Sequence, residues 1–213
     1  MKALFLFFII FVGIFSCAQT KSKTMDTNSI GKVQVDLKDK AVATFAGGCF
    51  WCTETIFESI KGVHEVVSGY SGGTENNPTY EKVGNGETSH AEAFQVYYDP
   101  AEVSYQDLVR VFFASIDPTI VNGQGPDRGA QYRTIAFYNT DAEKAIIEEK
   151  IRELAVEYNK PIATQVVKFD KFYQAEDYHQ DFVRRNPNQP YVRAESIPRR
   201  ERTLAKVKDL VKN

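Results

Sequence analysis

A short apolar run, a glycine pair and a helix start follow one another in this chain. Residues 41–46, Ala-Val-Ala-Thr-Phe-Ala, are typical of a buried strand, and apolar residues recur with helical spacing from Thr53 to Ile60. The segment between them reads Gly47-Gly48-Cys49-Phe50-Trp51-Cys52. It must turn the chain sharply from strand to helix, and it carries two thiols three residues apart.

This turn predicts a reactive thiol at Cys49. Free backbone N–H groups and the helix dipole favour an anion at a helix start. We therefore expect Cys49 to be exposed and to ionise more readily than an ordinary cysteine. If the helix begins at Phe50, about 5 to 6 Å separates the Cβ atoms of Cys49 and Cys52, so a disulfide can close after a modest adjustment.

The thiol pair allows three interpretations: a metal site, a thioredoxin-like dithiol, or a nucleophile with its resolving partner. A structural zinc site needs four ligands, and the other candidates are scattered without paired spacing: His64, His90 and His179. Metal is therefore the least favoured interpretation, and no metal ligands are predicted.

Residues 1–17 have the pattern of an export signal. Lys2 is followed by an unbroken apolar run to Phe15, which is too short to span a bilayer comfortably. The following Ser16-Cys17 resembles the end of the lipobox of bacterial lipoproteins. The favoured interpretation is cleavage before Cys17 and lipidation of its thiol, which predicts a lipoprotein of a bacterial envelope that faces the periplasm. Cleavage after Ala18 and an uncleaved anchor are the alternatives, and each also predicts export.

Export simplifies the cysteine count. If Cys17 is removed or acylated, only Cys49 and Cys52 remain as thiols. Their disulfide would close a very short loop and add little stability, so a redox role fits better than a structural one. Residues 18–40 are polar and lack periodicity, which predicts a flexible tether ahead of a domain at residues 41–213 that ends in a basic tail.

Strands and helices are expected to alternate along this domain without a strict repeat. Further strands are predicted at residues 63–69, 93–98, 134–138 and 164–169, and helices after Ser104 and Thr140, near 175–184 and at 199–212. Both Ser104 and Thr140 begin segments with the spacing of a capping box. The order predicts an α+β fold, a ferredoxin-like two-layer sandwich with a mixed β-sheet and flanking helices.

The charge of the chain argues against binding of nucleic acid, and the positions of its glycines indicate where the functional site lies. The formal net charge is −2 with acids and bases mixed, so the sequence offers no electrostatic footprint for nucleic acid. Eleven of the 13 glycines lie between Gly47 and Gly129, so the functional site is expected among the loops of this half. We expect a monomer.

The thiol segment and five others resemble one enzyme family. GCFWC followed by Thr53-Glu54 resembles the GCFWG-x-E signature of A-type peptide methionine sulfoxide reductases, which reduce the S epimer of methionine sulfoxide. Further matches, in the family's order, are GYSGG at 69–73, PTYEKV at 78–83, HAEA at 90–93, DRGAQYR at 127–133 and AEDYH at 175–179. The resemblance covers about residues 41–192.

The resemblance implies how the sulfoxide is attacked. Cys49 matches the nucleophile, whose thiolate attacks the sulfoxide sulfur and is left as a sulfenic acid. Glu92 matches the acid, which needs a raised pKa to donate a proton near neutral pH. Tyr80 and Tyr132 match hydroxyls that hold the sulfoxide oxygen. Without the resemblance to the family, Glu92 would be interpreted as a charged side chain on the surface, and each of the two tyrosines as a residue packed in the core.

Three more residues match the surroundings of the reaction. Phe50 and Trp51 match the lining of the methyl pocket, although aromatics at a helix start are about as often plain core. Asp127 matches a carboxylate that organises the site, and Asp127-Arg128-Gly129 could equally be a turn with a surface ion pair.

The chain departs from the family at two positions that matter for recycling. Cys52 stands where many members have glycine, and Val192 stands where many carry a recycling cysteine after NPNQPY. Cys52 is then the only nearby thiol that can condense with a Cys49 sulfenic acid. The disulfide would be reduced by an external thioredoxin-like dithiol, in the periplasm or linked to the membrane, with no bound cofactor.

The sequence therefore predicts a peptide-methionine (S)-S-oxide reductase that repairs oxidised methionine in envelope proteins. A general thiol–disulfide oxidoreductase that uses the same two cysteines is the main alternative. A lipoprotein without catalytic activity is the third interpretation.

Overall fold

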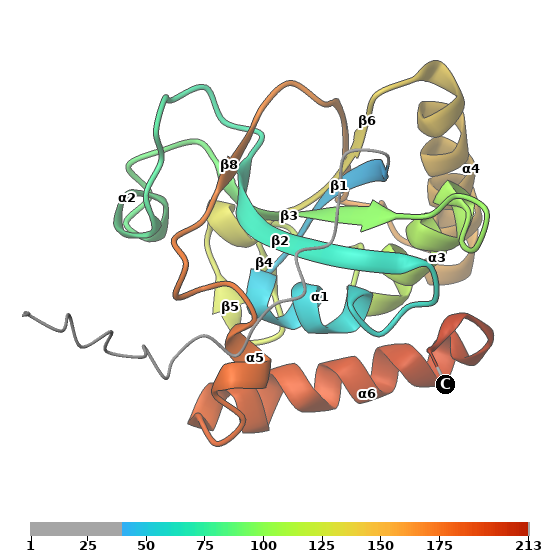
Figure 1. Ribbon diagram of the computed structural model, residues 1–213. Helices are drawn as coiled ribbons and strands as arrows, with labels where there is room; N and C mark the ends of the chain where they lie inside the picture. Colours follow the sequence, from blue (N-terminus) through green and yellow to red (C-terminus); the bar gives the residue numbers. More distant parts are fainter. Residues whose placement is uncertain (1–39, 213) are drawn as a thin grey trace, which may run out of the picture. The chain divides into compact units, whose positions relative to one another are not determined.

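The computed structural model describes residues 40–212, and its central feature is a six-stranded sheet (Figure 1). The strands lie in the order β7-β6-β1-β3-β2-β8. Their bounds are β1 Ala41–Gly47, β2 Val63–Ser71, β3 Ala91–Tyr98, β6 Thr134–Tyr138, β7 Gln165–Lys168 and β8 Phe172–Gln174. Only β6 and β7 pair in parallel, so the predicted mixed sheet is confirmed.

Helices and short turns complete the fold. The α-helices are α1 Phe50–Phe57, α2 Tyr80–Gly84, α3 Tyr105–Ser115, α4 Asp141–Tyr158, α5 Phe182–Arg185 and α6 Ile197–Lys206. A small hairpin joins β4 Gly123–Gln124 to β5 Asp127–Arg128, and a 3-10 turn, η1, covers Ala130–Tyr132. A π-helical turn, η2 Val192–Ser196, leads into α6, and η3 Lys208–Leu210 follows it. The predicted α+β class is confirmed.

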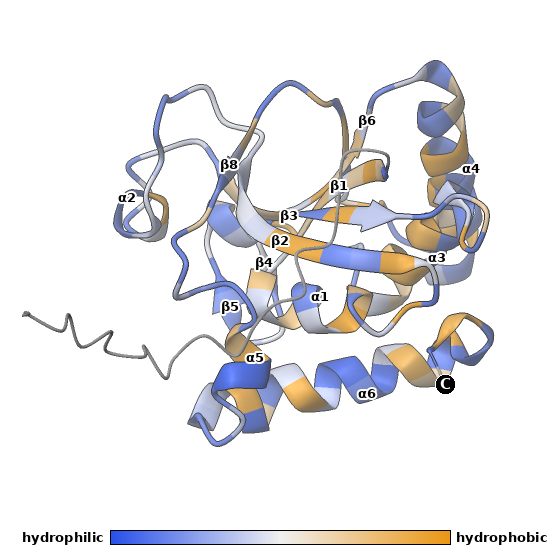
Figure 2. Cartoon of the chain, in the orientation of Figure 1, coloured by the Kyte–Doolittle hydropathy of each residue, from blue (hydrophilic) through white to orange (hydrophobic). Residues whose placement is uncertain are grey.

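Aromatic packing between the sheet and helices forms the largest core. Phe45 of β1 lies at its centre, with ring centroids 4.8 Å from Phe112 on α3, 5.8 Å from Phe57 on α1 and 5.9 Å from Phe94 on β3. These rings are almost fully buried, and burial of each stabilises the fold by about 1.5–3 kcal/mol. Hydrophobic and hydrophilic segments alternate along β2, whose hydrophobic residues are mostly buried (Figure 2).

The strand register brings the functional end of the sheet together. Antiparallel β1 and β3 pair with Phe45 opposite Phe94, so the chain leaves β1 beside the start of β3. Gly48 then turns the chain with φ +79°, and a Cβ there would lie 2.6 Å from the Cβ of Gln124. Only glycine fits this turn, which places Cys49 at the start of α1.

Two of the predicted helices begin where their caps were expected. The Ser104 hydroxyl accepts a hydrogen bond from the Asp107 N–H, and the Asp107 carboxylate accepts one from the Ser104 N–H. Thr140 caps α4 by accepting from the Glu143 N–H. The Glu143 carboxylate accepts instead from the Asn139 N–H, so the second box is only half formed.

The helix predicted near residues 175–184 is wrong. Only Phe182–Arg185 is helical, and Asp181 before it has a left-handed backbone with φ +56°. The Gln180 side chain accepts from the Ser68 N–H and donates to the Ser68 carbonyl, which ties this segment to β2. Such tertiary hydrogen bonds hold the segment in turns, although its sequence is compatible with a helix.

The basic C-terminal segment is helical, but its helix begins before the predicted start at Arg199 and ends at Lys206, short of the predicted residue 212. It begins as a π-turn and α6, and it contacts α1 and α3; α6 runs below α1 in Figure 1. Its end docks on the domain, because Lys212 Nζ donates to the carbonyls of Glu58 and Val63. No helix within residues 40–212 has the length and apolar character needed to cross a bilayer.

Candidate active site

Cys49 lies at the N-cap position of α1, as the strand-turn-helix pattern predicts. Its carbonyl accepts hydrogen bonds from the N–H groups of Cys52 (3.1 Å) and Thr53 (3.4 Å), which form the first helical turn. The expected exposure is wrong, because only 6% of Cys49 is accessible and only 1% of Cys52. The turn is contacted by Tyr191 and Ser196, which follow β8 in the chain, and by Gln124 of the β4–β5 hairpin.

The two thiols have opposite pKa shifts. Burial raises the pKa of Cys49, and the negative charge of the neighbouring Cys52 sulfur raises it further. The pKa of Cys52 is lowered to about 6, first by a hydrogen bond from the Cys49 thiol and then by Arg199 and Ser196. Burial therefore opposes the ready ionisation of Cys49 that its place at a helix start predicts, and the lowered pKa favours the thiolate form of Cys52.

A cavity of about 230 Å³ opens beside the Cys49 sulfur. Its volume is below the roughly 300–1,000 Å³ of sites that bury a whole drug-sized ligand, so it suits a single side chain. Its lining contains Cys49, Phe50, Trp51, Tyr80, Glu92, Asp127, Tyr132, Gln189 and Tyr191. Seven of these residues were predicted from the sequence, and they come together from four separate sequence motifs.

Glu92, at the start of β3, is the buried acid of this cavity. Only 3% of it is exposed, and its Oε2 accepts a hydrogen bond from the Phe50 N–H at 3.0 Å. Burial raises its pKa to about 8, with a further contribution from the negative charge of Asp127. Glu92 is therefore protonated near neutral pH, which is the state that the sequence analysis required.

Tyr80 and Tyr132 line the same cavity. Burial raises the pKa of Tyr80 to about 12 and also raises that of Tyr132, so both hydroxyls keep their protons. Within residues 40–212 neither hydroxyl has a hydrogen-bond partner in the protein. Both are free to donate to a ligand oxygen.

Phe50 and Trp51 form the apolar part of the lining. Phe50 is buried among Tyr70, Tyr80 and His179, so it serves both the core and the cavity. Trp51 stacks on Phe182 with ring centroids 3.8 Å apart. These contacts fix two flat apolar surfaces next to Cys49.

Asp127 is held inside the site instead of forming a surface ion pair with Arg128. Its Oδ2 accepts a hydrogen bond from the Tyr191 hydroxyl at 2.6 Å, and the Arg128 guanidinium donates to backbone carbonyls. The Asp127–Tyr191 pair lines this cavity and a second one beyond Cys52.

The sequence analysis missed residues that hold the lining in place. Glu176 accepts from the Tyr70 hydroxyl at 2.8 Å and from the Tyr80 N–H at 3.0 Å. Trp51 Nε1 donates to His179 Nδ1 at 3.0 Å, and burial lowers the pKa of His179 to about 4, which keeps that nitrogen an acceptor. Glu176 and His179 lie in the AEDYH segment, and the match of this segment to the family was the sequence signal that could have identified them.

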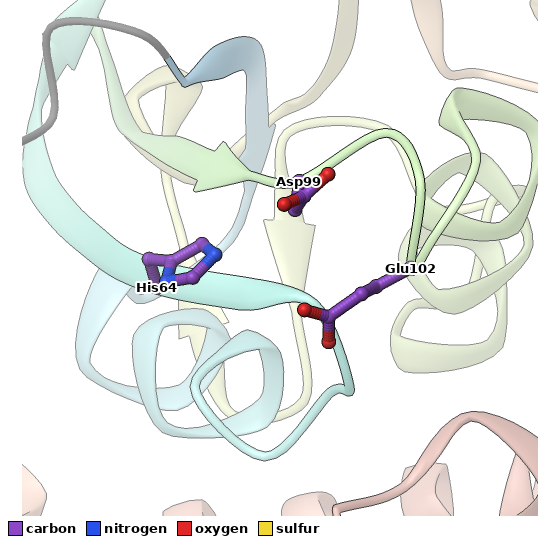
Figure 3. A group of neighbouring side chains, drawn as sticks. All are labelled: His64, Asp99 and Glu102. Carbon is purple, nitrogen blue, oxygen red and sulfur yellow. The ribbon is translucent and has the colours of Figure 1, made fainter.

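The three histidines occupy settings apart from the thiols. His90 shapes its loop by accepting from the Gly73 N–H. His64 lies near Asp99 and Glu102 in a largely exposed group (Figure 3). Lys40 Nζ approaches the Asp99 carboxylate at 3.6 Å. Neither cluster with metal-compatible spacing within residues 40–212 includes a cysteine. Cys17, the predicted lipidation site, lies outside the described residues, as do the predicted signal and most of the tether.

This geometry agrees with comparisons to known proteins. The family described as "Peptide methionine sulfoxide reductase" matches residues 41–210. The chain belongs to this family. It is 50% identical over 153 residues to MsrA 1 of Rhodopirellula baltica, covering 72% of this chain and 80% of that protein. It is 48% identical over 171 residues to an MsrA of Thermus thermophilus, covering 80% of this chain and 97% of that protein.

A solved structure supports the same assignment. Reduced Mxr1 of Saccharomyces cerevisiae is 34% identical, with a TM-score of 0.65 over 70% of this chain and 87% of that one. The reductase fold, the family match and the similarity to A-type enzymes together give the activity, which is reduction of peptide methionine sulfoxide. The alternative of a general thiol–disulfide oxidoreductase is not favoured.

Proposed function

We propose that Cys49 reduces methionine-(S)-sulfoxide in the cavity beside it. The observation that carries the proposal is a protonated acid, Glu92, and two unpaired hydroxyls, of Tyr80 and Tyr132, that line the same small cavity as the Cys49 thiol. Three donors suit the sulfoxide oxygen, and the Phe50 and Trp51 surfaces suit the methyl group. Oxygen, methyl and peptide side are thus distinguished, so the site can select one epimer.

The first step transfers the oxygen to sulfur of the enzyme. The Cys49 sulfur attacks the sulfoxide sulfur. Glu92 protonates the oxygen, whose developing charge is also held by Tyr80 and Tyr132. Methionine leaves, Cys49 becomes a sulfenic acid, and the proton lost from the Cys49 thiol restores Glu92, so that one thiol and one sulfoxide give one sulfenic acid and one methionine.

The second step closes the disulfide within the first turn of α1. The Cys52 thiolate attacks the Cys49 sulfenic sulfur, the S–O bond breaks, and the leaving hydroxide takes a proton from Glu92 to form water. Val192, at the tail position that carries a recycling cysteine in many relatives, is buried and has no thiol, so Cys52 is the resolving residue. A thioredoxin-like dithiol then reduces the Cys49–Cys52 disulfide and is itself oxidised to a disulfide, and its two protons restore the Cys49 thiol and the Glu92 acid.

The acid of the cavity also argues for this role over general disulfide exchange. A dithiol exchanger has no use for a buried neutral glutamic acid beside its thiols.

A single-turnover experiment tests the two steps. The reduced protein, mixed with a methionine-(S)-sulfoxide peptide without reductant, should yield one methionine and a Cys49–Cys52 disulfide visible by peptide mass spectrometry. Cys52→Ser should still yield methionine once but fail to cycle with thioredoxin, and Cys49→Ser should yield none. Methionine release without that disulfide would refute the resolving step.

We also propose that the reductase acts outside the cytoplasm. The pattern of residues 1–17 supports an export signal, with Cys17 lipidated and residues 18–40 as a tether to a monomeric domain at 41–213. The substrates would be oxidised methionines of envelope proteins. Mass spectrometry of the mature N-terminus tests this: an acylated Cys17 supports the proposal, and a mature chain that begins at Gln19 refutes lipidation.

A further inference from the structure

The C-terminal segment, although it lacks a thiol, contacts the resolving cysteine directly. The Cys52 sulfur lies 3.2 Å from Ser196 Oγ and 3.9 Å from the Tyr191 hydroxyl. Cys52 and Ser196 are 1% and 0% exposed, so their contact is shielded from water. In a buried site a hydrogen bond to a charged sulfur is stronger than in water.

The hydrogen bonds of the two hydroxyls show which of them can donate a proton to the Cys52 sulfur. Tyr191 gives its only hydroxyl proton to Asp127 Oδ2 at 2.6 Å, so toward Cys52 its oxygen can only accept. The Ser196 hydroxyl has Cys52 as its one hydrogen-bond partner within the part of the chain that the structure describes. Ser196 is therefore the hydroxyl that can donate to a Cys52 thiolate.

Arg199, one helical turn after Ser196, adds a positive charge. Its Nη2 donates to the Gly47 carbonyl at 2.6 Å and its Nε to the Ser115 carbonyl at 2.9 Å, which anchors the guanidinium beside the thiol turn. No carboxylate within residues 40–212 forms an ion pair with it. Its charge is available to a neighbouring anion.

Cys52 also has its own opening, separate from the sulfoxide cavity. A second cavity of about 300 Å³ reaches Cys52 and is lined by Arg199 among other residues. The Asp127–Tyr191 pair lines both cavities and stands between them. The second cavity therefore reaches Cys52 from outside the substrate site.

We propose that Ser196 and Arg199 are positioning residues for the resolving step, because together they hold Cys52 as a thiolate next to the Cys49 sulfur. The inference rests on the proposed role of Cys52 as the resolving thiol. The segment that supplies a recycling cysteine in many relatives would here prepare a cysteine of α1 for that task. A stabilised Cys52 thiolate is also a good leaving group when the disulfide is reduced.

The lowered pKa of Cys52 agrees with this arrangement, and other charges surround it. Facing Cys52 or its cavity are Cys49 on the turn, Glu92 on β3, Asp127 on β5, and Tyr191, Glu195 and Arg199 on the C-terminal segment. Asp117, Arg202 and Lys206 line the same second cavity. A test must therefore change Ser196 and Arg199 while it leaves the remaining charges in place.

The test measures the pKa of Cys52 in full-length Cys49→Ser protein, where a serine hydroxyl replaces the donating thiol. Alkylation of Cys52 by iodoacetamide is followed against pH by peptide mass spectrometry, which separates it from Cys17. We expect the midpoint to lie below the ordinary value of 9.0 for a cysteine thiol, because Arg199 and Ser196 remain in place. Added Ser196→Ala or Arg199→Gln should each raise it by about one unit, and Arg199→Lys should restore most of the shift.

A matched control is Ser59→Ala, because Ser59 bonds Arg200 of α6 and lies away from the thiols. It should leave the midpoint unchanged. In the protein with both cysteines, Ser196→Ala should raise the pH midpoint of Cys49–Cys52 disulfide formation by about one unit.

Unchanged midpoints in both Ser196→Ala and Arg199→Gln would overturn the inference, and the second variant keeps it testable if the first does not fold. Failure of the proposed function looks different, because the parent protein would then form no Cys49–Cys52 disulfide after releasing methionine. The two failures are therefore distinguishable.

Discussion

Glu92 shows how one buried side chain links stability to chemistry. Its carboxyl is enclosed at the start of β3, and it accepts one backbone hydrogen bond, from Phe50. This single hydrogen bond does not offset the cost of removing the carboxylate from water, so the Glu92 carboxyl keeps its proton up to a pH of about 8. Glu92 is therefore a proton donor for the site, and it is also a buried acid whose ionisation would destabilise the fold.

Replacing this acid should separate reduction of the sulfoxide from reduction of the disulfide. Glu92→Gln keeps the shape and removes the donated proton, so kcat/KM for a methionine-(S)-sulfoxide peptide should fall about 100-fold or more. In the parent, kcat/KM should decline above about pH 8 as Glu92 loses its proton. The exposed Glu87→Gln is the control, and full turnover by Glu92→Gln would disprove the assignment of the acid.

The same substitution should change how stability depends on pH. Between the unfolded pKa of 4.5 and the folded value of about 8, the folded protein binds the extra proton, so its free energy of unfolding decreases as pH rises. From pH 5 to pH 8 the parent should lose about 3 kcal/mol relative to Glu92→Gln. Urea unfolding at both pH values measures this, and parallel pH dependences of the two proteins would contradict it.

At the residue scale, the matched motifs predicted the substrate cavity but not its surroundings. Seven side chains were predicted because each belongs to a family motif with a chemical role. The burial of Cys49 could not be predicted, since the covering segments are distant in sequence. Ser196 and Arg199 were missed for a similar reason: nothing nearby in the sequence indicates that they contact Cys52.

At the scale of elements, local caps were reliable signals. The reciprocal bonds of Ser104 and Asp107 start α3 at the expected residue. The short elements α2, β8 and the β4–β5 hairpin were missed, because segments of two to five residues carry little periodicity. The error at residues 175–184 arose where side chains of that segment bond to β2 and α2.

The α3 cap gives a prediction at this scale. Ser104→Ala leaves the Asp107 N–H without its acceptor, so the free energy of unfolding should decrease by about 1 kcal/mol. Urea unfolding measures the loss, and Ser104→Asp, which retains a capping acceptor, should recover most of it. Equal stability of the alanine variant and the parent would show that the cap contributes little.

At the scale of the whole molecule, the order of strands and helices indicated the α+β class but not the sheet order. In the sheet β1 lies between β6 and β3, which are far from it or not adjacent to it in the sequence. Such long-range pairing cannot be read from the order of strands along the chain. The order in the sheet brings the ends of β1 and β3 together with the hairpin and the C-terminal segment. The cavity therefore exists only in the complete domain.

The central claim is tested most directly with separated sulfoxide epimers. The full-length protein is assayed with dithiothreitol and peptides that contain either methionine-(S)-sulfoxide or methionine-(R)-sulfoxide, and methionine is quantified. We predict turnover of the S epimer and none of the R epimer. Turnover of the R epimer alone, or of neither epimer by a folded and reduced protein, would contradict the account.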